Sequence, residues 1–174
     1  PSFSDFFLYA GRLERYKGVL ELMDLFKEID CRLIVAGKGP LGDEVKSFLK
    51  ANRLDDRISY LGYVDRGTLC KLLTDAEALI VPSMWPENCP LIALESLSVG
   101  TPVIASDSGG LPEIVEKVDR SLVYHDMVDL RRILLNYDKD KYLSSVRRIY
   151  EKYYSPEAFM DEYFDLIDGT RRCL

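Results

Sequence analysis

Two glutamates eight positions apart are the first residues of this sequence that suggest chemistry. Glu95 is the one charged residue in the nine-residue run LIALESLSV, from Leu91 to Val99. A helix this apolar is usually buried, and an ionised carboxylate is almost never buried without a partner. Glu87 lies where the same helix should begin. We therefore expect Glu95 to be buried against a partner. A purely structural carboxylate in the middle of this helix would need a buried Arg or several hydrogen-bond donors.

Cations and glycines follow the predicted strands. The loop GRLERYKG contains Arg12 and Lys17, and the later loop GKGP contains Lys38. In open α/β sheets, ligands bind outside the carboxyl ends of the strands. Backbone N–H groups and helix N-termini hold phosphate oxygens at such places, while Arg and Lys neutralise their charge. This composition predicts a site for a phosphorylated ligand.

Each of these features also has an ordinary structural explanation when it is taken alone. Arg12 could pair with Glu14 at the surface, where ion pairs are common and weak. Lys38 could be solvated, and the glycines beside it could serve turn geometry only. The stretch SDSGG, residues 106–110, could be a simple strand-to-helix turn. The prediction of a site therefore rests on the combination.

The elements that must position these loops are short apolar runs that alternate with amphipathic stretches. In residues 18–29, apolar residues recur at three- and four-residue steps, which predicts a helix with one buried face. Strands that are apolar throughout are typical of parallel sheets covered on both faces. We predict strands at 6–10, 31–37, 57–63, 78–83, 102–106 and 121–124. Helices are predicted at 18–29, 41–52, 65–76, 89–100 and 111–117.

The sequence changes character near residue 126 and continues as consecutive helices, MVDLRRILLNYD, KYLSSVRRIYEKY and SPEAFMDEYFDLID. Ser155 is expected to cap the last helix, with Pro156 in its first turn. Six strands with helical crossovers predict a doubly wound, parallel, Rossmann-like α/β sheet with helices on both faces. Residues 1–174 are expected to form a single domain, with the α/β core at about 1–125 and a helical tail at 126–174.

Composition and charge narrow the classes of function. The formal net charge of −6 argues against general nucleic-acid binding. No apolar run approaches the length of a membrane span. The four cysteines show no CxxC pairing and no histidine at metal-ligand spacing, which favours reduced thiols and a cytoplasmic setting. His125 is the only histidine and is expected to be a surface or packing residue.

Five motifs in register resemble the C-terminal half of a GT-B glycosyltransferase, and most closely the retaining glycosyltransferase family 4. They are GRLxxxKG at 11–18, VAGKGP at 35–40, YLGYV at 60–64, ENCPLIALE at 87–95 and GTPVIASDSGGLPEIV at 100–115. The resemblance covers about residues 5–125, and the paired glutamates with the downstream glycine motif are its most specific part. The terminal helices resemble the family's closing segment, where the chain crosses back towards the other half.

The resemblance implies catalytic roles for three residues. Arg12 and Lys17 would hold the diphosphate of a nucleotide-sugar donor and stabilise it as it departs. Glu87 would lie beside the transferred sugar and contact its hydroxyls. One position departs from the family, because Pro90 stands where many relatives have glycine and has no N–H to donate.

Other positions would bind the nucleotide, again as the resemblance implies. Glu95 would accept hydrogen bonds from the ribose hydroxyls, so that the ligand is the partner of this acid. Backbone groups at the start of its helix would face phosphate and sugar, and the loops after the second and third strands would flank the base. The positions at the helix start are Cys89 and Leu91. The positions in the two loops are Gly37, Lys38, Gly39 and Tyr63.

The implied reaction is transfer of a hexose, with mannose and glucose as candidates, from a UDP- or GDP-sugar in polysaccharide biosynthesis. No metal or other cofactor is expected, because the cations and helix-start amides take its place. The D-x-D sequence Asp138–Lys139–Asp140 falls in the tail and is expected to be a solvated turn. The full-length enzyme would be cytoplasmic, with peripheral attachment at the inner membrane face as an alternative.

The family's N-terminal half, with its acceptor site and histidine, has no counterpart in this sequence. The chain alone is therefore expected to bind donor without transferring sugar, while a glycan or lipid-linked acceptor is held by that other half. One alternative is half of a nucleotide-sugar 2-epimerase, which the acid–base groups of the absent half would distinguish. A non-catalytic nucleotide-binding module is a second alternative. A dinucleotide-dependent oxidoreductase is disfavoured, because no strand is followed by GxGxxG.

Overall fold

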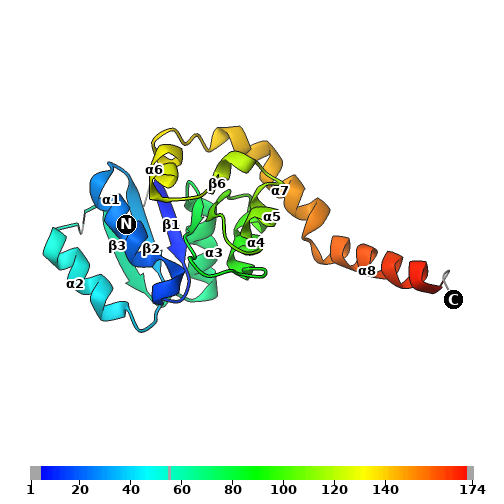
Figure 1. Ribbon diagram of the computed structural model, residues 1–174, viewed down its shortest axis with the longest axis horizontal. Helices are drawn as coiled ribbons and strands as arrows, with labels where there is room; N and C mark the ends of the chain where they lie inside the picture. Colours follow the sequence, from blue (N-terminus) through cyan, green and yellow to red (C-terminus); the bar gives the residue numbers. More distant parts are fainter. Residues whose placement is uncertain (1–4, 55, 172–174) are drawn as a thin grey trace.

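The computed structural model describes residues 5–54 and 56–171 of the chain, so that Cys173 lies outside the described residues. Its centre is one six-stranded sheet in which every pair of neighbouring strands is parallel (Figure 1). The strands lie in the order β3-β2-β1-β4-β5-β6. They are β1 (Phe6–Ala10), β2 (Arg32–Ala36), β3 (Ile58–Gly62), β4 (Leu79–Val81), β5 (Val103–Ser106) and β6 (Val123–Tyr124). The predicted doubly wound, Rossmann-like sheet is confirmed.

Helices connect the strands and form the tail. The crossovers are the 3-10 helix η1 (Arg15–Lys17), α1 (Val19–Glu28), α2 (Gly42–Asn52), α3 (Arg66–Asp75), α4 (Leu91–Ser98), α5 (Leu111–Val115) and the 3-10 helix η2 (Arg120–Leu122). The tail is α6 (Met127–Leu135), α7 (Asp140–Tyr153) and α8 (Pro156–Arg171). α1 contacts α6, whereas α3 contacts α4. All the predicted elements are present, with ends that differ by no more than a few residues.

The apolar stripe predicted for the first helix is buried. Val19, Leu22, Met23, Phe26 and Ile29 are each at most 2% exposed. They pack into one continuous core with the strands, and the central strands β1 and β4 are buried on both faces. Burial on both faces explains why the strands read as unbroken apolar runs and not as alternating ones.

The strand order creates a crevice at the centre of the sheet. The chain passes from β1 outwards to β3 on one side, and then returns to place β4 on the other side of β1. The connections after β1 and β4 therefore leave the sheet in opposite directions. Ligands of open α/β sheets bind where the strand order reverses in this way.

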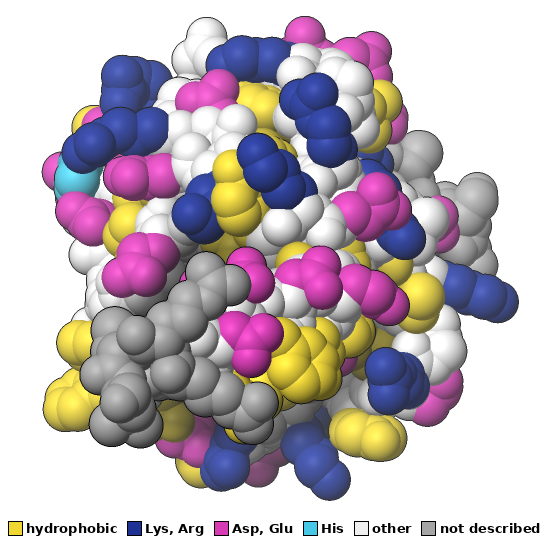
Figure 2. Space-filling view, turned by 90° about the vertical axis from the view of Figure 1, so that its right-hand side faces the viewer, with side chains coloured by type: hydrophobic (Ala, Val, Ile, Leu, Met, Phe, Trp, Pro, Cys, Tyr) yellow, Lys and Arg dark blue, Asp and Glu magenta, His cyan; other side chains and the backbone are white. Residues whose placement is uncertain are grey.

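The last helix extends away from the sheet (Figure 1). Ser155 caps it as predicted, because its Oγ accepts a hydrogen bond from the Ala158 N–H at 3.1 Å. Phe159, Tyr163 and Phe164 are about half exposed or more on α8. Figure 2, viewed from the side on which α8 projects, shows hydrophobic side chains next to acidic ones. Among the described residues, no helix is long and apolar enough to cross a membrane.

Candidate functional site

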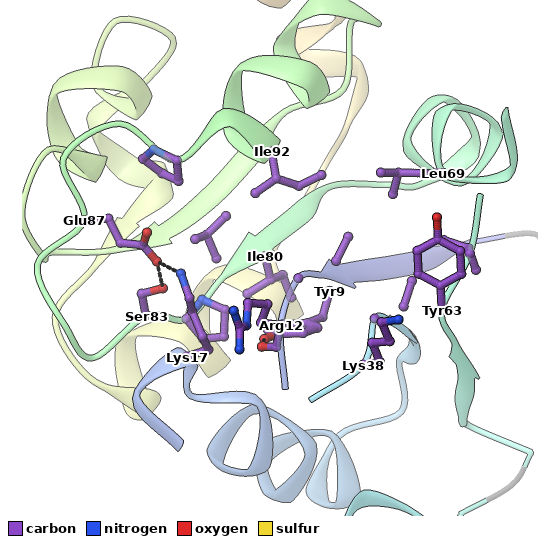
Figure 3. Close-up of a pocket in the computed structure, with 18 residues that line it drawn as sticks. Tyr9, Arg12, Lys17, Lys38, Tyr63, Leu69, Ile80, Ser83, Glu87 and Ile92 are labelled. Atoms are coloured by element: carbon purple, nitrogen blue, oxygen red, sulfur yellow. Dashed lines mark hydrogen bonds and ion pairs between the residues drawn. The ribbon is translucent and has the colours of Figure 1, made fainter. Parts of the chain in front are cut away.

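A pocket of about 390 Å³ lies at the carboxyl ends of the central strands (Figure 3). Its volume is within the range of small-molecule sites, which are largely apolar with a few polar groups. The apolar lining includes Val64, Leu69, Ile80, Val81, Pro90 and Ile92. The polar and charged lining consists of Tyr9, Arg12, Lys17, Lys38, Tyr63, Ser83 and Glu87. Loops from distant parts of the sequence thus meet in one place.

Lys17 reaches the pocket because the loop after β1 approaches the end of β4 closely. Gly18 has φ +70°, and a Cβ atom on it would lie 2.1 Å from the Pro82 carbonyl oxygen. The Met84 N–H donates to the Tyr16 carbonyl oxygen at 2.8 Å, which joins the two loops. Only glycine fits this approach and this backbone conformation. The last residue of GRLxxxKG therefore positions the lysine before it.

Glu87 is the acid among the residues that line the pocket, and two side chains hold its carboxylate. Its Oε1 atom accepts hydrogen bonds from Lys17 Nζ and from Ser83 Oγ, the latter at 2.5 Å (Figure 3). Burial raises the pKa of the Glu87 carboxyl, but the bonds from Lys17 and Ser83 and the charge of Lys17 outweigh this effect and lower the pKa. Glu87 is therefore an ionised, oriented acceptor at neutral pH.

The SDSGG stretch holds the backbone beside Glu87. The Gly110 N–H donates to the Glu87 carbonyl oxygen at 2.6 Å, and Glu87 and Gly109 form an isolated parallel bridge. A Cβ on Gly109 would lie 2.4 Å from the Glu87 carbonyl oxygen, and one on Gly110 would lie 2.1 Å from that of Asn88. The motif is thus more than a turn, because its two glycines allow its backbone to pack directly against the backbone of the loop that contains Glu87.

Arg12 forms the exposed rim of the pocket. Its guanidinium pairs with Glu14 at 2.6 Å, and its side chain is 73% exposed. The ordinary ion pair considered for this residue is therefore present in the structure. Below it, the buried Tyr9 hydroxyl donates to the Arg12 carbonyl oxygen at 2.7 Å. The backbone of Arg12 is fixed, while its side chain has room to turn towards a ligand.

The opposite end of the pocket combines a cation with an aromatic ring. Lys38 Nζ lies 5.0 Å from the centre of the Tyr63 ring, which is 71% exposed. Gly37 joins this end to the first loop, because its Cβ position would lie 1.8 Å from the Gly11 carbonyl oxygen. Gly39 does not line the pocket; a Cβ on it would meet the backbone of Leu13 at 2.4 Å. Its structural role is close packing between loops.

Besides Gly39, three predicted positions lie outside this pocket. Leu91, Glu95 and Cys89 are exposed, and the pocket is lined by their neighbours Pro90 and Ile92. The expectation that Glu95 is buried is wrong.

The physical reason is the way α4 packs. This helix buries the stripe formed by Ala93, Ser96 and Leu97. Leu91 and Glu95 are four residues apart and share an uncovered face. Glu95 instead lines a small neighbouring hollow between α3 and α4, which shares Leu69 with the main pocket.

Two polar residues that line the pocket were not predicted from the sequence. Tyr9 is the penultimate residue of β1, and Ser83 follows β4 in the sequence VPS. Both are buried, at 3% and 1% exposure. Their position at the carboxyl ends of two central strands is a signal that could have identified them.

The remaining predicted features lie elsewhere. His125 pairs with Asp107 at 2.8 Å and is 63% exposed, outside the pocket. The D-x-D sequence forms the turn before α7, where the Asp138 carboxylate accepts the Asp140 N–H at 3.1 Å. Across residues 5–54 and 56–171, no cluster of three or more His, Cys, Asp or Glu side chains could hold a metal ion.

Known proteins are similar to this chain in sequence and in fold. An uncharacterized glycosyltransferase of Methanocaldococcus jannaschii is 30% identical over 158 residues, which cover 84% of this chain and 40% of that protein. Glycogen synthase of Mycobacterium tuberculosis is 34% identical over 113 residues, or 62% of this chain and 27% of that enzyme. The chain thus spans less than half the length of these curated relatives.

Solved structures of GT-B glycosyltransferases match the fold over nearly the whole chain. Sucrose-phosphate synthase from Thermosynechococcus elongatus superposes with a TM-score of 0.77 and 26% identity, over 100% of this chain and 47% of that one. The Anabaena protein Alr3699/HepE, solved in complex with UDP, superposes with a TM-score of 0.79 and 19% identity, over 95% of this chain and 49% of that one. The family model for glycosyl transferases group 1 matches residues 2–129. The chain therefore belongs to the glycosyl transferases group 1 family.

Proposed function

We propose that this chain is the donor-binding half of a retaining glycosyltransferase of family 4, which binds a UDP- or GDP-linked hexose such as glucose or mannose. One observation carries the proposal. Arg12, Lys17 and Lys38 come from loops after two different strands and line the same pocket as Glu87. Three cations and one oriented carboxylate suit a ligand that has a diphosphate and a hydroxylated ring.

The geometry suggests how such a ligand would be arranged. The diphosphate would lie near Lys17 and the exposed Arg12, at the start of α4. This helix has no side-chain cap, so its first N–H groups can serve an anion. The sugar would lie at Glu87, and the base would reach the end formed by Lys38 and Tyr63. UDP in the Anabaena neighbour supports a nucleoside diphosphate as the common part of the ligand.

Stabilising the departing diphosphate is the chemistry that these groups can supply. As the bond to the sugar breaks, negative charge grows on the phosphate oxygens. Fixed cations and N–H groups lower the barrier when they are aimed at such charge before the reaction begins. Glu87 would orient the sugar through its hydroxyls, since its carboxylate is ionised and held on one side.

A ligand screen tests the proposal. We expect UDP or GDP, and its sugar conjugate, to raise the thermal midpoint of the chain, whereas ADP serves as the comparison. The variant carrying Arg12→Ala and Lys17→Ala should lose the shift. Lys50→Ala, which removes an exposed cation on α2, should retain it. Absence of a shift with every nucleotide would count against donor binding.

Binding is expected to need no divalent metal. At about 100 times its dissociation constant, UDP or GDP should stabilise the fold by roughly 2.7 kcal/mol in EDTA as well as in magnesium. The reason is that Arg12 and Lys17 supply the positive charge. Unfolding in urea with and without each additive measures the effect. A shift that appears only with magnesium or manganese would contradict the metal-free proposal.

The two glutamates should have separable effects on binding. Glu95→Ala is expected to weaken the bare nucleotide about tenfold, because a hydrogen-bond acceptor for the ribose is lost. Glu87→Ala should spare the bare nucleotide, because Lys17 is then released from its pair, but weaken the gain from the attached sugar. Calorimetry with UDP or GDP and the matching sugar conjugate measures both. Glu157→Ala on the exposed α8 is the matched control; equal losses for Glu87→Ala and Glu95→Ala with both ligands would contradict these roles.

A further inference from the structure

A closed circuit of hydrogen bonds surrounds Glu87. Ser106 Oγ, at the end of β5, donates to the Ser83 carbonyl oxygen at 2.6 Å. The Ser83 hydroxyl then donates to Glu87 Oε1 at 2.5 Å. The Glu87 carbonyl oxygen in turn accepts the Gly110 N–H at 2.6 Å, from the loop that follows Ser106. The chain segments after β4 and β5 are thus tied together through the backbone carbonyl oxygens of Ser83 and Glu87, and the Glu87 carboxylate is bonded back to Ser83.

Ser83 binds this carboxylate from the buried side of the pocket. The residue is 1% exposed, whereas the Glu87 side chain is 17% exposed at the pocket. A buried hydroxyl is costly unless it is bonded, so the Ser83 bond to Glu87 is strongly favoured. Its backbone cannot shift freely either, since Ser106 holds its carbonyl oxygen.

The two oxygens of Glu87 are used unequally. Lys17 and Ser83 both bond to Oε1 (Figure 3). Within the described part of the chain, both hydrogen bonds to the Glu87 carboxylate end on Oε1 and none ends on Oε2. A carboxylate can accept about four hydrogen bonds, so Oε2 keeps its capacity for a ligand. Without the Ser83 hydroxyl, the Glu87 carboxylate could rotate about its Cγ–Cδ bond, so that either oxygen could accept the bond from Lys17.

We infer that Ser83 is the positioning residue of Glu87, whose hydroxyl keeps Oε1 on Lys17 and leaves Oε2 facing the pocket for a sugar hydroxyl. The part that concerns the sugar rests on the proposed function. Although Ser83 lines the pocket, its hydroxyl proton is used by Glu87, so that it would act through this carboxylate. It acts by limiting the rotation of a group that would otherwise have to be ordered when the donor binds.

The first arm of the test needs no ligand. The Glu87 carboxyl carbon is followed by NMR as pH is varied, and its signal is assigned by its loss in Glu87→Gln. The titratable groups that act on Glu87 are Lys17 and Tyr16 from η1 and Tyr9 from β1, and all three remain in the variants. A hydrogen bond to the ionised form lowers a pKa, so Ser83→Ala should move the midpoint to higher pH. An unchanged midpoint would overturn the inference.

Two further variants separate positioning from simple loss of packing. Ser83→Thr keeps a hydroxyl and should restore the midpoint. Ser96→Ala is the matched control, because Ser96 is equally buried and its Oγ donates to the Thr101 carbonyl oxygen at 3.0 Å, away from the pocket. This control should leave the midpoint unchanged. If Ser96→Ala moved it as far as Ser83→Ala does, the effect would be structural and the inference would fail.

The second arm measures the preference for a nucleotide sugar over the bare nucleotide by calorimetry, with UDP and UDP-glucose, and with GDP and GDP-mannose. Ser83→Ala should reduce this preference about tenfold, a loss at the low end for a hydrogen bond to a charged group. Ser106→Ala should reduce it in the same direction and replaces Ser83→Ala if that variant does not fold. If Glu87→Gln loses the preference for the nucleotide sugar while Ser83→Ala and Ser106→Ala keep it, the inference about Ser83 is overturned and the proposed function is not. If the unaltered chain binds neither ligand, the proposed function fails, and the NMR arm still decides whether Ser83 positions Glu87.

Discussion

Residues 1–174 alone are expected to bind a nucleotide sugar and to transfer none of it to an acceptor. The pocket has the cations and the carboxylate that we propose for a diphosphate and a sugar, but it opens at one edge of the sheet. Holding two reactants in the right geometry can supply roughly 7–11 kcal/mol of a barrier, which corresponds to many orders of magnitude in rate. The alignment covers 40% of the Methanocaldococcus relative, and we propose that the acceptor is bound outside residues 1–174.

The measurement is transfer of labelled sugar from UDP-glucose or GDP-mannose to oligosaccharide and lipid-linked acceptors. Transfer by residues 1–174 at a rate typical of intact enzymes would refute the prediction. Fusing the first half of a relative ahead of Pro1 should restore transfer. The same fusion carrying Lys17→Ala should be inactive, which would show that the restored reaction uses this pocket.

Gly37→Ala is expected to cost at least about 3 kcal/mol of unfolding free energy, which is large beside the effect of most substitutions. Gly37 has φ +141°, a region that other residues avoid. The added Cβ would also lie 1.8 Å from the Gly11 carbonyl oxygen and 2.9 Å from its carbonyl carbon. Both contacts are with backbone, which has no side-chain rotation to relieve them. The loops after β1 and β2 would therefore separate, and nucleotide binding should weaken as well.

Gly62→Ala is the matched control. Gly62 also has positive φ, at +67°, but a Cβ there would meet no heavy atom within 4 Å. Only the backbone strain remains, which should cost about 1–2 kcal/mol. Urea denaturation of both variants measures the difference. Equal losses would mean that the close approach between the two loops does not contribute to stability.

The sequence by itself determined the elements and most of the polar and charged lining of the pocket. Apolar runs and helical periodicity are local patterns, so the parallel sheet, the α1 stripe and the Ser155 cap were predicted correctly. The motifs also identified Arg12, Lys17, Gly37, Lys38, Tyr63 and Glu87, all of which line the pocket. They could be assigned together because the carboxyl ends of parallel strands must meet at one edge of the sheet.

Only the tertiary structure decided which of these residues contact one another. Lys17 and Glu87 are 70 positions apart, and their pairing depends on β4 lying next to β1. Two further contacts depend on other neighbouring strands. Ser106, at the end of β5, donates to the Ser83 carbonyl oxygen beyond β4, and Gly39, after β2, packs against the backbone of Leu13, after β1.

Glu95 shows, within a single helix, the difference between what the sequence predicts and what the tertiary structure decides. The apolar composition of α4 predicted burial, yet burial depends on which stripe neighbouring elements cover. α3 and α7 both contact α4, and the face with Leu91 and Glu95 is left in water. Composition reports how much of a helix could be buried, whereas the direction of each side chain relative to its neighbours is set by packing.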